Sequence, residues 1–210
     1  LRMSAEGIRD MVLSSSGLLN RKIGGPSVKP YQPRGLWEAA TSGRGQLATY
    51  RQDKGEDLYR RGMYTFIKLT VPPPSMIIFD ASNRDECLVS RQKTNTPLQA
   101  LVMMNDPTVL EASRVFAETL VKKNINPENT ILTAFESIIC RKPVKKEMDL
   151  LSNYYKDQLT LFNNKKELAE KTIRAGEYPY NHNSSNITEV AALMRVINLI
   201  YNMEEAIVRV

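Results

Sequence analysis

Residues 91–107 constrain the fold of this chain more than any other stretch, because they contain two helix starts in quick succession. Thr96 and the proline after it are typical of a helix N-cap and first turn, since proline lacks only an N–H that the first turn leaves unpaired. Asp106 and its following proline repeat the signal, so a second helix is expected to leave the first at an angle. The intervening residues are nearly all apolar, which predicts a helix over about 97–105 that is buried on most sides.

Apolar residues recur at helical spacing through most of the chain, with Ser, Thr, Asn and Pro at the starts of the periodic segments. Further helices are predicted over about 5–19, 56–69, 107–123, 127–140, 145–162, 164–175 and 188–201. The helix over 56–69 is expected to be central, because apolar side chains surround its axis. Residues 75–94 are predicted to form an ordered polar loop that its apolar beginning, Met76 to Phe79, attaches to the core.

The predicted class is therefore all-α: an irregular multi-helix domain with long ordered loops in its first half. We expect residues 1–210 to form a single domain, with an Arg-rich half over 1–106 and a helical half over 107–210. Because the chain begins almost inside a helix, it is interpreted as a C-terminal fragment of a larger protein.

The net charge of +6 comes entirely from the first half of the chain. Residues 1–105 contain 15 Lys and Arg against 9 Asp and Glu, and arginines outnumber lysines there by ten to five, whereas residues 106–210 contain 14 of each sign. Arginine suits bidentate or buried pairing with carboxylates and phosphates. The favoured interpretation is internal pairing, with Asp10, Glu56, Asp57, Asp80, Asp85 and Glu86 as partners. An anion-binding cleft is the alternative, and no basic helix face of the kind that binds nucleic acid is present.

Few residues of this chain are suited to metal or haem chemistry. Cys87 and Cys140 are the only cysteines, His182 is the only histidine, and neither a Cys-x-x-Cys nor a haem-attachment motif occurs. We expect no cofactor and no metal in this fragment, and we expect the two cysteines to be unpaired. No apolar run approaches the roughly 18–20 residues of a membrane span.

Several segments together resemble the planctomycete-specific C-terminal domain of unknown function, which occurs in large proteins that also carry a planctomycete-type cytochrome c domain. The resemblance extends over essentially the whole chain. The matching segments are Ser4–Asp10, Ser16–Gly17, Gly24–Tyr31, Gly55–Arg61, Tyr64–Phe66, Pro72–Met76, Phe79–Asp80, Asn83–Arg84, Arg91–Pro107, Ala191–Leu199 and Asn202–Glu205.

The resemblance implies an exported, periplasmic or similarly located protein of planctomycetes or Bacteroidetes, often encoded beside genes for polysaccharide utilisation. It implies upstream domains of the same polypeptide as partners and places haem ligation in one of those domains. It provides no catalytic residues.

Two functions remain open from the sequence. The first is a non-catalytic accessory or interaction module that packs against the upstream domains. The second is a binding or hydrolytic site for an acidic or sulfated polysaccharide in the Arg-rich half, with Asp80 or Glu56 as acid or base. The candidate ligand-binding residues of this second hypothesis are Arg60, Arg61, Asp80, Asn83, Arg84, Arg91, Thr94 and Asn95.

One prediction separates these two functions. In the module interpretation, Arg60 or Arg61 pairs with Asp80, Asp85 or Glu86, and Arg91 binds backbone carbonyls or a carboxylate near Asn95. In the polysaccharide interpretation, the same arginines line an open cleft.

Overall fold

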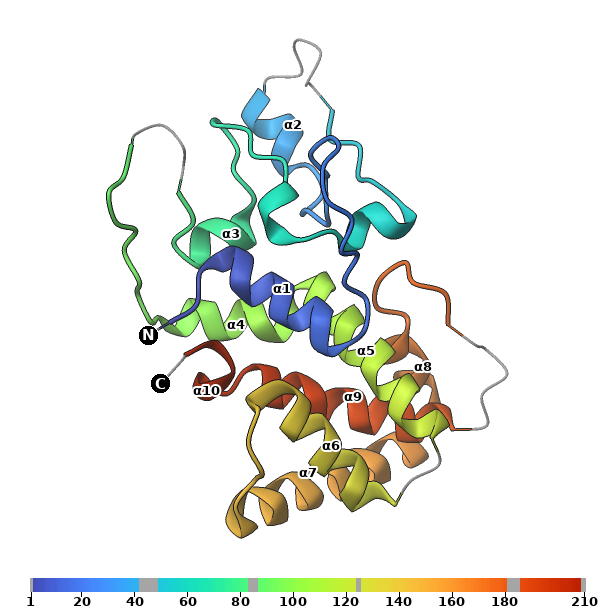
Figure 1. Ribbon diagram of the computed structural model, residues 1–210. Coiled ribbons are helices and arrows are strands. Elements are labelled where there is room, and N and C mark those ends of the chain that lie inside the picture. Colours follow the sequence, from blue (N-terminus) through green and yellow to red (C-terminus); the bar gives the residue numbers. More distant parts are fainter. Residues whose placement is uncertain (1, 42–48, 83–86, 124–125, 181–185, 209–210) are drawn as a thin grey trace.

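The computed structural model of the chain describes residues 2–41, 49–82, 87–123, 126–180 and 186–208. Its regular elements are helices (Figure 1). Within these residues no strand forms, and extended segments meet only at isolated bridges. The all-α prediction is confirmed. The elements are α1 (Ala5–Ser15), α2 (Leu36–Thr41), the 3-10 turns η1 (Gly55–Tyr59) and η2 (Gly62–Tyr64), α3 (Pro74–Ile78), α4 (Pro97–Asn105), α5 (Pro107–Lys122), α6 (Pro127–Ile139), α7 (Lys145–Asn164), α8 (Lys166–Ile173), α9 (Ile187–Tyr201) and α10 (Glu204–Ile207).

The proline-marked helix starts lie where the sequence predicts them. The Asp106 side chain accepts a hydrogen bond from Thr108 N at 2.8 Å and caps α5. Asn126 caps α6 in the same way, through Glu128 N at 3.0 Å. Each cap satisfies one amide that the first helical turn leaves unpaired. In the described part of the chain, none of the helices combines the length and the apolar character that crossing a membrane requires.

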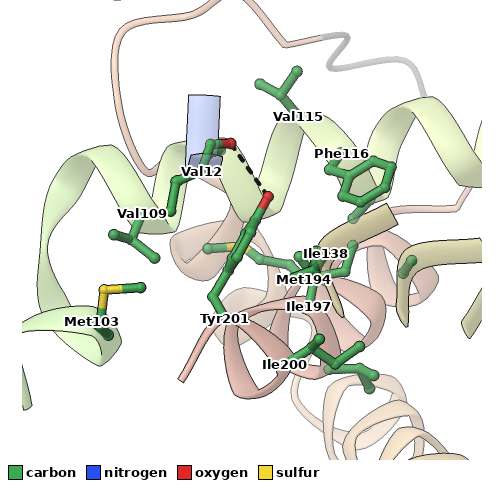
Figure 2. Close-up of a cluster of buried hydrophobic side chains, with 14 of the residues drawn as sticks. Val12, Met103, Val109, Val115, Phe116, Ile138, Met194, Ile197, Ile200 and Tyr201 are labelled. Carbon is green, nitrogen blue, oxygen red and sulfur yellow. Dashed lines mark hydrogen bonds between the residues drawn. The ribbon is translucent and has the colours of Figure 1, made fainter. Parts of the chain in front are cut away.

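Helix α9 is the centre of the second half and contacts α5, α6, α7 and α8 (Figure 1). Figure 2 shows Met194, Ile197 and Tyr201 of α9 among apolar side chains of neighbouring helices. The Tyr201 hydroxyl donates to the Val12 carbonyl oxygen at 3.3 Å and lies 2.7 Å from the Ser15 hydroxyl, so α9 is also bound to α1. One hydrophobic cluster consequently contains residues of both halves, from Ala5 to Ile207.

The predicted central helix over 56–69 is wrong. This segment forms only the two 3-10 turns η1 and η2, and Met63 and Leu69 are exposed. Its backbone pairs with distant parts of the chain instead. Asn20 N donates to the Tyr59 carbonyl oxygen at 2.9 Å, and Val28 N donates to the Tyr64 carbonyl oxygen at 2.8 Å. Long-range backbone pairing of this kind overrides a local helical pattern.

Helix α4 exists where it is predicted, but its predicted burial is wrong. The outward side chains of Leu98, Leu101 and Met104 are 51%, 55% and 47% exposed. The polar Gln99 is buried instead and donates from Nε2 to the Ile78 carbonyl oxygen at 2.9 Å. An apolar helix therefore turns one apolar side to solvent and a hydrogen-bonded amide to the core.

The segment after the three prolines is attached to the core as predicted, but the prediction that it lacks regular structure is wrong over residues 74–78. Pro74 opens the short helix α3, and Met76 and Phe79 are buried. Part of the predicted ordered loop, residues 83–86, lies outside the described residues. Cys87 and Cys140 are both free and exposed, which confirms the prediction that they are unpaired.

Candidate functional site

Arg60 is buried, with 2% of its surface exposed, and its guanidinium binds backbone rather than a carboxylate. It donates to the carbonyl oxygens of Pro26, Lys22 and Gly24 and lies 3.8 Å from the centroid of the Tyr64 ring. These contacts bind the turn over residues 22–26 to the segment that contains Arg60. Arg60 is therefore enclosed by its own loops and does not line an open cleft.

Arg61 pairs with helix α1. Its Nε donates to Asp10 Oδ2 at 2.9 Å, and the other oxygen of Asp10 accepts from Gly62 N at 2.6 Å. Gly62 lies so close to the α1 backbone that an added Cβ would stand 2.7 Å from the Glu6 Cα atom. The Asp10 carboxylate thus holds the η1–η2 segment against α1. This pair is exposed on the Arg61 side, so its electrostatic contribution is screened by water.

Asp80 pairs with Arg2 instead of Arg60 or Arg61, so that part of the pairing prediction is wrong. Asp80 Oδ2 accepts from Arg2 Nη2 at 2.5 Å and from Thr94 N at 2.8 Å. Burial raises the pKa of Asp80, but the hydrogen bonds from Thr94 and Arg2 lower it more, so the pKa lies below its usual value. The other predicted partners, Asp85 and Glu86, lie outside the described residues.

The structure describes only some of the remaining candidate residues. Arg91 binds a carboxylate, as predicted, but the carboxylate is not near Asn95: it is that of Glu6 on α1. Arg91 Nη1 donates to its two oxygens at 2.8 and 2.9 Å. Asn95 is exposed, and Asn83 and Arg84 lie outside the described residues. Glu56, the second acid or base candidate, is exposed at the rim of a hollow of about 490 Å³ that Tyr59 and Tyr178 also line.

A buried carboxylate that the sequence analysis did not single out joins four distant segments. Glu111 of α5 has none of its surface exposed and accepts from the Tyr31 hydroxyl at 2.9 Å, the Tyr59 hydroxyl at 3.1 Å and Tyr178 N at 2.6 Å. Burial and the nearby Glu111 carboxylate raise the pKa of both Tyr31 and Tyr59, so both hydroxyls remain protonated donors. A buried charge needs such donors to offset its desolvation.

Arg114, three residues further along α5, holds the same loop from its other side. Its guanidinium donates to the carbonyl oxygens of Ala175 and Tyr178, and to Glu118 Oε1 at 2.6 Å. Arg114 is 1% exposed, so this pairing is within the core. The sequence contains one signal for this site. Glu111 and Arg114 are charged and lie three residues apart within the apolar pattern of the helix predicted over 107–123. Apart from Glu118, their partners lie more than 50 residues away, and spacing in the sequence does not predict contacts of that length.

A cavity of about 50 Å³ lies between α1, α3 and the junction of α4 with α5. Apolar side chains form most of its wall, and a small set of polar groups lines the rest: Arg9, Tyr31, Thr65, Ser75, Asp106 and Thr108. An apolar pocket with few converging polar groups is the usual form of a small-ligand site. No cluster of three or more His, Cys, Asp or Glu that could hold a metal ion occurs among the residues that the structure describes.

The fold and these contacts define an all-α domain whose irregular first half is bound by arginine–carboxylate pairs to α1. The chain belongs to the PSD1 family of proteins of unknown function (DUF1553), whose model matches residues 1–155. No curated protein and no solved structure matches the chain.

Proposed function

We propose that this domain is a non-catalytic accessory module of a large exported polypeptide, resembling the planctomycete-type cytochrome c multidomain proteins, and that it docks onto the upstream domains through α4. The proposal of a non-catalytic module is supported by the arginines, which pair with groups of this same chain. Arg2, Arg61 and Arg91 bind carboxylates of this same chain, and Arg60 binds its carbonyl oxygens. These groups are therefore already occupied.

The apolar outer side of α4 carries the proposal. Leu98, Leu101 and Met104 follow one another at spacings of three residues and so lie on one side of the helix. Leu88 and Val89, in the preceding segment, are also exposed. Grouped apolar side chains that remain in water are typical of surfaces that another protein covers.

The position of the N-terminal end favours the upstream part of the polypeptide as the occupant. Arg2 and Thr94 bind the same Asp80 carboxylate, and Thr94 stands two residues before the N-cap of α4. Any segment joined to the N-terminal end therefore emerges beside the beginning of α4. Such a connection gives a high effective concentration, so a modest apolar surface is sufficient for docking.

Hydrogen–deuterium exchange of the full-length polypeptide, compared with this chain alone, tests the docking. We expect the amides of α4 to exchange more slowly in the full-length polypeptide, and Leu101→Asp to abolish that difference. Leu150→Asp is the matched control, because Leu150 is a 62% exposed leucine on α7. Equal exchange of α4 in the two proteins would refute docking through this helix.

The competing proposal is the acidic or sulfated polysaccharide site in the Arg-rich half. Thermal melts with uronic and sulfated oligosaccharides distinguish the two. The module proposal expects no rise in melting temperature, whereas a rise that Arg61→Ala or Arg91→Ala removes would replace it with glycan binding. Export to the periplasm is part of the proposal, and cell fractionation followed by immunodetection of the native protein tests it.

A further inference from the structure

The cavity beneath α1 is lined by Arg9, whose guanidinium feels the charges of Asp106 and Asp10 but makes no ion pair within 4.0 Å with a described carboxylate. Arg9 donates to the carbonyl oxygen of Leu58, and makes long contacts of 3.4 Å to the Arg60 carbonyl oxygen and 3.5 Å to the Thr108 hydroxyl. Arg2, Arg61, Arg91, Arg114 and Arg141 form ion pairs within 4.0 Å, and Arg9 forms none with the described carboxylates. Two of its three hydrogen bonds are thus weak by geometry.

A buried hydroxyl that lines the same cavity has no hydrogen-bond partner among the described residues. Thr65 is 4% exposed, lines the same cavity, and its Oγ1 makes no hydrogen bond to the described residues. Buried polar groups are nearly always hydrogen-bonded, so an unpaired one beside a cavity indicates a missing partner. The Arg9 guanidinium can only donate and the Thr65 hydroxyl can donate as well as accept, so a single acceptor can serve both groups.

We propose that this cavity is a binding site for a small monocarboxylate such as acetate or propionate. The carboxylate oxygens accept from Arg9 and Thr65, and the short alkyl chain lies against Met76, Phe79 and Met103, which line the wall. A single water needs about 10–15 Å³ on the same measure. A cavity of about 50 Å³ therefore has room for about three to five heavy atoms, the size of these acids.

Charges of both signs face the cavity, so its field does not favour a multiply charged anion. Asp106 lines the cavity, and its Oδ1 accepts from Thr108 N at the start of α5. Asp10, next to Arg9 on α1, is directed to Arg61 and Gly62. A monocarboxylate in the cavity meets one cation, Arg9, and is repelled by one carboxylate, Asp106.

Three variants test the site without removing Arg9, whose contacts to Leu58 and Arg60 also hold the fold. Thr65→Val keeps the shape and removes the unpaired hydroxyl, so the unliganded protein should be no less stable. Thr65→Ser restores a hydroxyl. Asp106→Asn keeps a side chain that caps helices equally well and removes the negative charge. Binding is measured by calorimetric titration with sodium propionate and by melting temperature, with sodium chloride at equal ionic strength as the reference.

We expect saturable propionate binding to the natural chain. Thr65→Val should bind propionate about tenfold more weakly, because it loses one hydrogen bond to a charged group. Thr65→Ser should recover the affinity of the natural chain. Asp106→Asn should bind several-fold more tightly. Absence of binding would overturn the proposal and leave water as the filling of the cavity. Equal binding by all four proteins would also overturn it, since the ligand would then lie elsewhere.

Discussion

Gly176 stands directly against the buried carboxylate of Glu111: a methyl group added to its Cα would lie 2.1 Å from Oε1 of that glutamate. The φ angle of Gly176 is +81°, in a region that residues other than glycine rarely adopt. The loop over residues 175–180 can therefore reach Tyr178 N to the carboxylate only because this position has no side chain.

Gly176→Ala should lower the free energy of unfolding by about 2–3 kcal/mol, because the new methyl group overlaps Glu111 as well as straining the backbone. Gly17→Ala is the matched control. Gly17 has nearly the same φ angle, +80°, with nothing within 4 Å of the added atom, and should cost only about 1 kcal/mol. Urea unfolding of both variants measures the difference. Equal losses would show that the contact with Glu111 is readily relieved.

Asp80→Ala should destabilise far more than Arg61→Ala. Removing Asp80 leaves Arg2 buried without its carboxylate, which is expected to cost about 2–3 kcal/mol. The Arg61 side chain is 51% exposed, and water replaces its partner, so its removal should change stability little. Asp80→Asn, which tolerates the φ of +56° at this position, should fall between them. Thermal and urea unfolding give the ranking, and a larger loss for Arg61→Ala would contradict it.

Cys140→Gly should raise the free energy of unfolding by about 0.5–1 kcal/mol. Cys140 ends α6 in the left-handed conformation, with φ of +62°, where glycine is the preferred residue. Its side chain is exposed, so little packing is lost. Cys140→Ala removes the sulfur but keeps the strain, and should leave stability nearly unchanged. A gain in both variants would assign the effect to the thiol rather than to the backbone.

Acid should weaken the contact between α6, α7 and α10. Hydrogen bonds from Arg141, together with that from Val144 N, lower the pKa of Glu147 from 4.5 to about 2. Since the folded pKa is the lower one, this stabilisation is present above about pH 4.5 and is lost as the pH falls towards 2.

The Glu147→Gln variant should therefore be less stable than the natural chain at about pH 7 and decline less steeply on acidification. Differential scanning calorimetry across this range measures both. Glu170→Gln, an exposed glutamate of α8, is the control and should follow the natural chain. Parallel curves for the natural chain and Glu147→Gln would refute the assignment.

Local signals predicted the helices well. The caps before α4, α5 and α6 depend on a residue and its next neighbours, so the sequence contains all the information that they need. The helix predicted over 56–69 failed because its amides and carbonyls pair with Asn20 and Val28, about 40 residues earlier. The predicted burial of α4 was wrong because periodicity shows only that a helix has an apolar side. It does not show whether other parts of the same chain cover that side.

The charge pattern predicted internal pairing of arginines, and the structure brings Asp10 and Asp80 into such pairs. It did not predict which arginine meets which carboxylate, since all of these pairs span at least 50 residues. Glu111 and the cavity at Arg9 were missed for the same reason. Their partners come from loops whose positions only the complete fold determines.

The central position of α9 has a consequence for synthesis. Helices α5 to α8 leave the ribosome first, and the apolar sides that they turn towards α9 have nothing to cover them until residues 187–201 follow. The family match ends at residue 155, within α7, and so does not include the helix that completes the core. A nascent chain halted before α9 therefore exposes those apolar sides, and exposed surface of this kind makes a chain prone to aggregation and a substrate for chaperones.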